Sequence, residues 1–189
     1  MISTAKIKLQ IRQQCIFFGL ILSLSVLATS QSFASKANTP PRVADQVDLS
    51  RYMGGWYEIA AFPNVFQRGC RCSRAFYSLQ GTDVRIVNQC LDKNNQLKQA
   101  TARAWQAKAG SSSQLKVQFF WPFRGDYWIL YVSPNYQDAI VGSPHRKYLW
   151  FLSRSRQLSE KRYQYLVSLA AAQGFDVSKL RRTSQRCES

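Results

Sequence analysis

One stretch of the sequence decides the fold, namely residues 48–60, which read DLSRYMGGWYEIA. We expect a short helical turn to run directly into a strand here, with Gly-x-Trp at the junction. Gly54 gives the backbone room where the chain enters the strand. Trp56 is a large apolar side chain whose indole N–H needs a partner, so we expect it to fill an apolar interior.

The N-terminal residues have the pattern of an export signal. Lys6, Lys8 and Arg12 form a basic leader without acidic neighbours, and residues 15–28 form a mostly apolar run. That run has the length of a signal-peptide core, whereas a membrane-spanning helix needs about 20 apolar residues. Residues 1–34 are therefore predicted to be a signal peptide that is cleaved after small residues. A buried N-terminal helix is the alternative.

The export signal predicts a periplasmic or secreted protein that is soluble after cleavage. Cys15 lies at the start of the apolar run, where it is badly placed to carry a lipid once the leader is removed. Association with an outer membrane stays open, but no lipidation cysteine stands in the expected place.

The chain that remains after cleavage is strongly basic. Removal of residues 1–34 removes three basic residues and leaves 23 basic and 10 acidic ones, for a net charge of +13. The remaining length suffices for one domain with a single core. Residues 35–46 are rich in proline and polar residues and are predicted to be a loose N-terminal arm. The folded domain is expected over residues 47–189.

Four cysteines remain after cleavage: Cys70, Cys72, Cys90 and Cys187. An even number of cysteines in an exported chain predicts two disulfides, and four cysteines allow three connectivities. On a regular hairpin the first two cysteines lie almost equally close to the third, so the hairpin alone leaves the pairing open. No metal site is expected, because Cys-x-Cys is tight for a zinc knuckle and His145, the only histidine, lies in a predicted turn.

Downstream of Trp56 the sequence reads as strands separated by turns. The expected strands are residues 56–62, 72–79, 84–90, 98–108, 115–121, 126–133, 136–142 and 147–154. Eight strands joined mostly by short loops predict an antiparallel up-and-down barrel, because closure of the sheet leaves no edge exposed.

One helix is expected after the strands. Ser159 is a suitable N-cap, and Gly174 is a suitable end. Apolar residues recur between them at helical spacing and form one stripe, namely Tyr163, Leu166, Val167, Ala170 and Ala171. We expect the stripe to pack against the barrel wall, and a membrane-surface helix is the alternative. The predicted fold class is therefore all-β with one C-terminal flanking α-helix.

This order of elements resembles the lipocalin family, and within it the bacterial lipocalin and apolipoprotein D branch. The resemblance covers nearly all of residues 47–187. It rests on the GGWYEIA entry and on an ordered set of segments: FQRG (66–69), AFYSL (75–79), VRIVN (84–88), FFWPF (119–123), YQDAIV (136–141), YLWFLSR (148–154) and GFDVSK (174–179). The family implies a barrel with one closed end, one open mouth and an apolar cavity for lipids.

The resemblance also assigns structural roles. Gly54 and Trp56 belong to the family's entry motif, and Arg154 is implied to lie over Trp56 at the closed end as a cation–π contact.

For the cysteines, the resemblance implies a bridge from Cys72 to Cys187 that ties the tail to the barrel. Cys70 then remains for Cys90. The shuffled pairing, Cys72 with Cys90 and Cys70 with Cys187, is the alternative.

A barrel of about eight strands is just wide enough to hold one small ligand. The candidates for the inner wall are aromatic: Trp56, Tyr77, Trp105, Phe119, Trp121, Tyr127 and Tyr131. Their alternative role is to fill the barrel completely. Space would remain if small residues point inward, for example Ala75, Ala100, Ala102 and Ala104. Periodicity leaves open which residues of each strand face inward.

We expect the ligand to be a long-chain fatty acid or a lysophospholipid, held for transport, storage or membrane maintenance. Each buried methylene contributes about 0.8 kcal/mol, so a long chain needs few polar contacts. The head group is expected at the mouth, where Arg68 and Arg124 are the candidates to meet a carboxylate or phosphate. The alternative is that both arginines are solvated surface charge. No cofactor is expected.

Two other classes of function stand beside lipid binding. An enzyme needs a nucleophile with a base or positioned carboxylates, and the sequence has neither motif, so no activity is expected. Enzymes that modify pigments use this fold, which keeps the class open. The basic charge and the aromatic residues would also fit a polyanion binder. Nucleic acid is not expected as a partner, whereas transient contact with an anionic membrane surface fits the charge.

Overall fold

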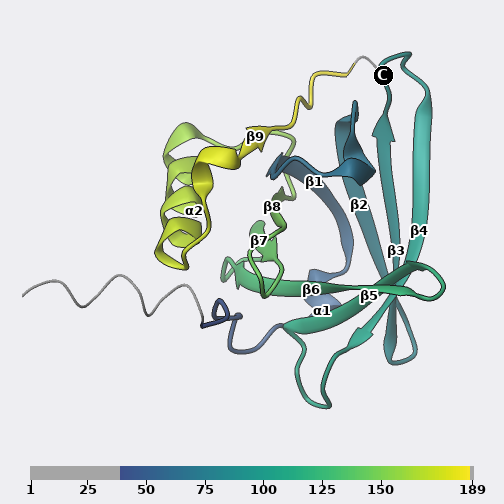
Figure 1. Ribbon diagram of the computed structural model, residues 1–189, viewed down its shortest axis with the longest axis vertical. Coiled ribbons are helices and arrows are strands. Elements are labelled where there is room, and N and C mark those ends of the chain that lie inside the picture. The colour runs from purple at the N-terminus through teal and green to yellow at the C-terminus, as the bar shows by residue number, and fades with distance from the viewer. Residues whose placement is uncertain (1–38, 188–189) are drawn as a thin grey trace, which may run out of the picture. The chain divides into compact units, whose positions relative to one another are not determined.

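The structure, a computed structural model, describes residues 39–187, and the predicted signal peptide lies outside them. Strands wrap into a barrel that has one long helix beside it (Figure 1). The strands are β1 (Gly54–Ala61), β2 (Arg71–Gln80), β3 (Asp83–Leu91), β4 (Leu97–Gln106), β5 (Gln114–Phe120), β6 (Phe123–Val132), β7 (Asp138–Gly142), β8 (Leu149–Ser153) and β9 (Arg181–Arg182). The helices are α1 (Leu49–Tyr52), α2 (Glu160–Ala172) and the single turns η1 (Val65–Gln67) and η2 (Val177–Lys179).

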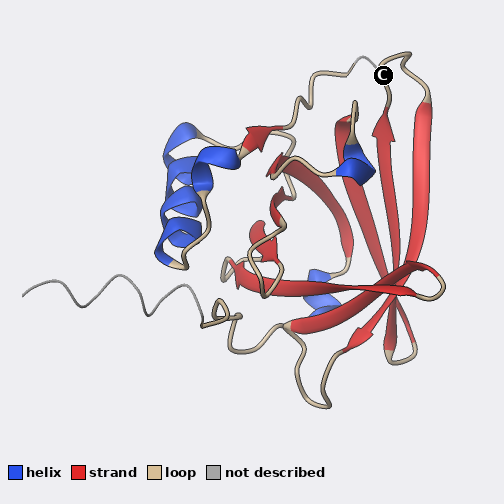
Figure 2. Cartoon of the chain, viewed as in Figure 1, coloured by secondary structure: helices blue, strands red, loops and turns tan. Residues whose placement is uncertain are grey.

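The strands pair in chain order, and the sheet closes on itself. Each of β1 to β8 is antiparallel to the next, and β1 pairs with both β2 and β8. The expected eight-stranded antiparallel barrel is therefore confirmed (Figure 2). The sequence patterns did not indicate β9, a ninth short strand that pairs with β1 at Ala60 and Ala61.

The helical turn and the strand expected in residues 48–60 are both present. The Asp48 side chain accepts hydrogen bonds from the amides of Ser50 and Arg51 and caps α1. Trp56 is buried, and its indole N–H donates to the carbonyl of Tyr52. Gly54 has a φ of +92°, a conformation that glycine adopts without strain.

Two apolar clusters lie on the two sides of the barrel wall. One lies in the interior and includes Trp56, Tyr77, Ala104 and Ile129. The other lies between the outside of the wall and α2, where it includes Leu166.

Helix α2 stands beside β7 and β8 (Figure 1). Its buried residues are Tyr163, Leu166 and Ala170, so the predicted apolar stripe packs on the barrel. The Ser159 side chain accepts from the amide of Arg162, as expected of an N-cap.

The described part of the N-terminal arm corrects the sequence prediction. The amide of Ala44 donates to the carbonyl of Ile129, and the Ser113 hydroxyl donates to the carbonyl of Ala44. Val43 and Ala44 also pack against the two apolar clusters. Val43 and Ala44 are therefore attached to the barrel and are not loose, because the backbone groups of Ala44 find partners on β6 and the loop before β5.

The barrel wall is discontinuous between β1 and β2. These strands pair only where Gly54–Tyr57 face Arg74–Tyr77. Further along, the C-terminal segment 181–187 lies between them: the amide of Thr183 donates to the carbonyl of Ile59, and the amide of Cys72 donates to the carbonyl of Ser184. We call this place the β1–β2 seam.

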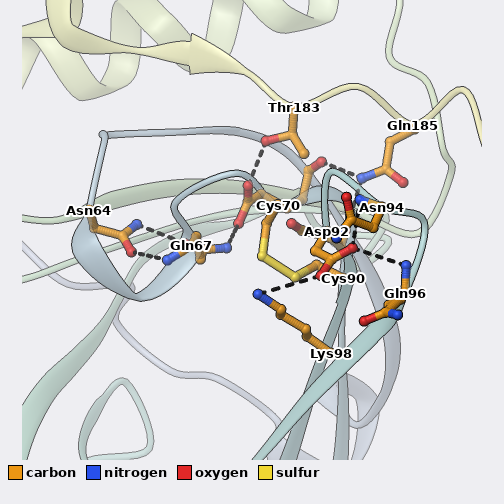
Figure 3. Close-up of a disulfide and its surroundings, with 12 residues drawn as sticks. Asn64, Gln67, Cys70, Cys90, Asp92, Asn94, Gln96, Lys98, Thr183 and Gln185 are labelled. Carbon is orange, nitrogen blue, oxygen red and sulfur yellow. Dashed lines mark hydrogen bonds and ion pairs between the residues drawn. A yellow bond between two sulfur atoms is a disulfide. The ribbon is translucent and has the colours of Figure 1, made fainter.

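Both disulfides lie near the seam, and Figure 3 shows the one between Cys70 and Cys90. Cys70 is bonded to Cys90, and Cys72 is bonded to Cys187, which is the pairing that the resemblance implies. The second bridge fastens the C-terminal segment to the start of β2.

Within residues 39–187, no helix is long and apolar enough to cross a membrane. The same residues contain no group of three or more histidine, cysteine, aspartate or glutamate side chains arranged to hold a metal ion.

Candidate functional site

The barrel has an open end and a closed end. Strand order puts the loops after β1, β3, β5 and β7 at one end, which we call the mouth, and α1 at the other. On the inner face of β4, Ala102 and Ala104 are buried but Ala100 is exposed. The interior is therefore accessible to solvent from the mouth and closed near α1.

Arg154 and Trp56 hold the closed end together. The Arg154 guanidinium lies 3.8 Å from the centroid of the Trp56 ring. It also donates to the carbonyls of Gly55, Tyr52 and Met53. The arrangement is the one that the resemblance implies, and it is structural because every acceptor belongs to the chain itself.

Three tyrosines form a hydrogen-bonded chain deep in the interior. The hydroxyl of Tyr127 lies 2.9 Å from the hydroxyls of both Tyr52 and Tyr77. Burial raises the pKa of all three phenols, that of Tyr77 to about 12, so they are neutral at physiological pH. Neutral phenols keep this part of the interior uncharged.

A second polar group lies on the inner wall nearer the mouth. The carboxyl of Glu58 is buried and accepts hydrogen bonds from the Gln67 amide and the Thr183 hydroxyl. Gln67 in turn accepts from the indole N–H of Trp150, at 2.9 Å. Figure 3 shows Gln67 and Thr183 approaching this point from the first loop and the C-terminal segment. Burial raises the pKa of Glu58 above its usual value.

Ser73 completes this group on the β2 side. It is buried on the same face of β2 as Ala75 and Tyr77, and its hydroxyl has no hydrogen-bond partner in the described chain. The Gln185 amide donates to the backbone carbonyls of both Glu58 and Ser73, which makes the two residues neighbours across the seam. We call Glu58, Gln67, Ser73 and Thr183 the inner polar patch.

The sequence patterns did not indicate this patch. A usable signal was present, because Trp56 faces the interior and strict alternation places Glu58 on the same face. The contributions of Gln67 and Thr183 come from loops and the tail, for which periodicity gives no orientation.

Three of the predicted wall residues face the interior. Trp56 and Tyr77 belong to the interior cluster, and the half-buried Tyr127 packs against it. Phe119 shares its strand face with Leu115 and Val117, but it lies at the mouth and is 42% exposed.

Three other predicted wall residues are not in the interior. Trp105 lies on the outer face of β4, because the neighbouring alanines take the inner one. Trp121 lies in the turn between β5 and β6 and is 83% exposed. Tyr131 packs toward α2, where its hydroxyl accepts from Arg162 at 2.7 Å. The prediction that these rings line the interior is wrong.

The two arginines predicted for the head group lie apart. Arg68 is exposed in the loop between β1 and β2, at the mouth. Arg124 lies on the outer wall, 5.6 Å from the centroid of the Trp105 ring. Arg124 therefore does not face the interior, and its assignment to the head group, like that of Arg68, stays a prediction.

A barrel with one closed end, a flanking helix and an apolar interior belongs to the class of binding barrels. The family model of a lipocalin-like domain matches residues 47–185. The chain therefore belongs to the lipocalin family, as the sequence analysis expects.

Curated relatives confirm the branch. The chain is 40% identical over 154 residues to temperature-induced lipocalin-1 of Arabidopsis thaliana, covering 76% of this chain and 82% of that protein. It is 35% identical to outer membrane lipoprotein Blc of Citrobacter freundii, covering 82% of this chain and 91% of that protein. Apolipoprotein D of Macaca fascicularis is 30% identical, covering 88% of this chain and 95% of that protein.

Among solved structures, apocrustacyanin C1 matches with a TM-score of 0.65 and 18% identity, covering 79% of this chain and 92% of that one. At this identity the match shows the shared barrel fold alone.

Proposed function

We propose that this protein is exported and holds one long-chain lipid in its barrel. The observation that carries the proposal is an apolar interior that is closed at one end and reachable at the other. Ala75, Ala102 and Ala104 line one side of it with short side chains. Apolar surface of this kind gains free energy by taking an acyl chain out of water.

The first ligands to test are long-chain fatty acids and lysophospholipids. Trp56 lies in the interior, and Trp150 packs against the interior cluster, so a bound ligand should change tryptophan fluorescence. We expect saturable quenching with one ligand per chain. Absence of both saturable quenching and displacement of a fluorescent lipid probe would contradict the proposal.

We further propose that the mouth touches an anionic membrane surface when lipid is exchanged. The turn between β5 and β6 carries Phe120, Trp121 and Phe123, all exposed, and we call these residues the mouth tip. Phe66 is exposed in another loop at the same end. Exposed apolar clusters mark interaction sites, and tryptophan favours the interface between lipid and water. The net positive charge would favour anionic head groups.

An enzymatic role has little support from the described groups. Catalysis requires a nucleophile or acid–base pair facing a substrate. The buried ionisable groups of the interior are three neutral phenols and the carboxyl of Glu58. Turnover of a hydrophobic substrate by the purified protein would contradict a role in binding alone.

Polyanion binding is the second candidate, favoured by one feature of the outer wall. Arg103 and Arg124 both lie near the Trp105 ring, beside a hollow of about 660 Å³. Arg85 lies directly opposite Arg103 on the neighbouring strand. Arg103 is paired with Asp83, so Arg85 and Arg124 are the cations of this group that an anionic partner would meet. Salt-sensitive binding of a sulfated polysaccharide, without any lipid binding, would favour this candidate over the first.

A further inference from the structure

The buried charged groups in the described part of the chain are acidic. Among residues 39–187, the buried polar and charged side chains are two carboxylic acids and five serines, and no lysine, arginine or histidine is buried. Asp138, one of the acids, is paired with Arg162 on the outer side of the wall. Glu58, the other, has no cation within ion-pair distance in the described chain. A ligand beside Glu58 therefore meets a carboxyl that no cation of the described chain pairs with.

The inner polar patch has hydrogen-bonding capacity that the fold leaves unused. Ser73 is only 4% exposed, and its hydroxyl makes no hydrogen bond in the described chain. A buried hydroxyl without a partner costs free energy, so buried polar groups are almost always paired. Ser73 shares its buried face of β2 with Ala75 and Tyr77, which places the hydroxyl on the wall of the interior.

Charge decides which polar end of a lipid fits beside these groups. Two carboxylates in an apolar interior repel strongly, and one of them has to take up a proton. A hydroxyl or an ester carbonyl carries no net charge. It can exchange hydrogen bonds with the Ser73 hydroxyl and the Glu58 carboxyl without that cost.

We propose that the inner polar patch binds the polar end of the ligand and selects lipids whose polar end is uncharged, such as long-chain alcohols or monoacylglycerols, over fatty acid anions. This inference rests on the proposed function and names the class of lipid that the barrel holds. The polar end of the lipid is then recognised by the inner polar patch and not by the surface arginines Arg68 and Arg124.

The first test compares two ligands with the same chain, oleyl alcohol and oleate, at pH 8. Each competes with N-phenyl-1-naphthylamine, an uncharged fluorescent probe, for the full exported chain. We expect the alcohol to bind at least about tenfold more tightly, because one uncompensated charge in the interior costs that much or more. Equal or tighter binding of oleate overturns the inference. If the probe binds and neither ligand displaces it, the inference also fails. Absence of binding by probe and ligands contradicts the proposed function itself.

The second test uses two variants of the patch and one matched control. Glu58→Gln removes the buried carboxyl and with it any repulsion of a second carboxylate, so oleate should gain about tenfold while the alcohol changes by less than about threefold. Ser73→Ala should weaken the alcohol about three- to tenfold, the worth of one hydrogen bond, without improving oleate. The control Asp126→Asn removes a carboxylate that pairs with Lys116 on the outer wall, and the ratio of the two affinities should stay unchanged.

An unchanged ratio in a folded Glu58→Gln protein overturns the inference. The comparison of the two ligands on the wild-type chain and the Ser73→Ala result decide the question even if Glu58→Gln fails to fold.

Discussion

Arg154 joins the end of the last barrel strand to the start of the first one through Trp56. Its guanidinium lies 3.8 Å from the centroid of the indole ring, while its nitrogens donate to backbone carbonyls of residues 51–53 and 55. The carbonyls of residues 51–53 lie at the C-terminal end of α1, where a helix leaves its last carbonyls without intrahelical partners. One side chain thus donates hydrogen bonds to the free carbonyls of the short helix and also covers the indole ring of Trp56.

Replacement of Arg154 by alanine should destabilise the fold. The variant loses the cation–π contact and leaves several carbonyls unpaired, so we expect about 1 to 3 kcal/mol less stability in chemical unfolding. Lipid affinity of the folded fraction should hardly change, because the residue lies at the closed end. An unchanged melting temperature together with lost lipid binding would place Arg154 in the ligand site instead.

Removal of the aromatic side chain of Trp121 should weaken vesicle binding. Burial of a large apolar side chain is worth about 1.5 to 3 kcal/mol, so Trp121→Ala should lose about tenfold or more in affinity for phosphatidylglycerol vesicles. Phe76→Ala is the matched control, because Phe76 is 57% exposed but lies on the outer wall of β2. Co-sedimentation at low salt measures both. Equal losses in the two variants would show that the mouth tip has no special role.

The long disulfide should stabilise the protein more than the short one. Cys72 and Cys187 are 115 residues apart, and the chain-entropy model gives about 4 to 5 kcal/mol for such a bridge. The matched control replaces Cys70 and Cys90, which are 20 residues apart, with an expected loss of about 3 kcal/mol. Serine double variants and thermal unfolding measure the difference. A peptide map that links Cys70 to Cys187 would contradict the pairing itself.

Glu58 should make stability depend on pH in a defined direction. Burial raises its pKa above 4.5, so the native state holds this proton more tightly than the unfolded chain does. The resulting stability is complete below about pH 4.5 and is lost as the pH rises through the native pKa. Each unit of pKa difference is worth about 1.4 kcal/mol. Relative to wild type, Glu58→Gln should therefore gain stability between pH 4 and pH 8. A constant difference across this range would contradict the assignment.

Turn signals and alternation were sufficient to predict the eight strands and the flanking helix, because both are local properties of the sequence. The inner wall was harder, because irregularities in the strands shift which residues face inward. On β6 a register shift separates Ile129, which is interior, from Tyr131, which faces α2. Strict alternation would place both on the same side.

The two misplaced tryptophans have different causes. Trp121 continues the alternation of Leu115, Val117 and Phe119, but the strand ends at Phe120 and the ring falls in a turn. Trp105 alternates with Ala102 and Ala104 along β4, so the tryptophan and the alanines cannot both face inward. The inner polar patch was not predicted because two of its members lie outside the strands. Gln67 lies in a loop and Thr183 in the C-terminal segment, and periodicity predicts no orientation for either.

The β1–β2 seam has a consequence for how the barrel moves. Backbone pairing between these strands covers four residues of each, and the remaining contacts run through a segment more than 100 residues away in the chain. On its mouth half β1 is paired with β8 and with the two-residue strand β9, and short segments near a chain terminus open locally at lower free-energy cost than the rest of a fold. Amide protons along the mouth half of β1 should therefore exchange with solvent sooner than those of the fully paired β3. We therefore expect the barrel wall to be least rigid at the seam, where the C-terminal segment lies against the first strand.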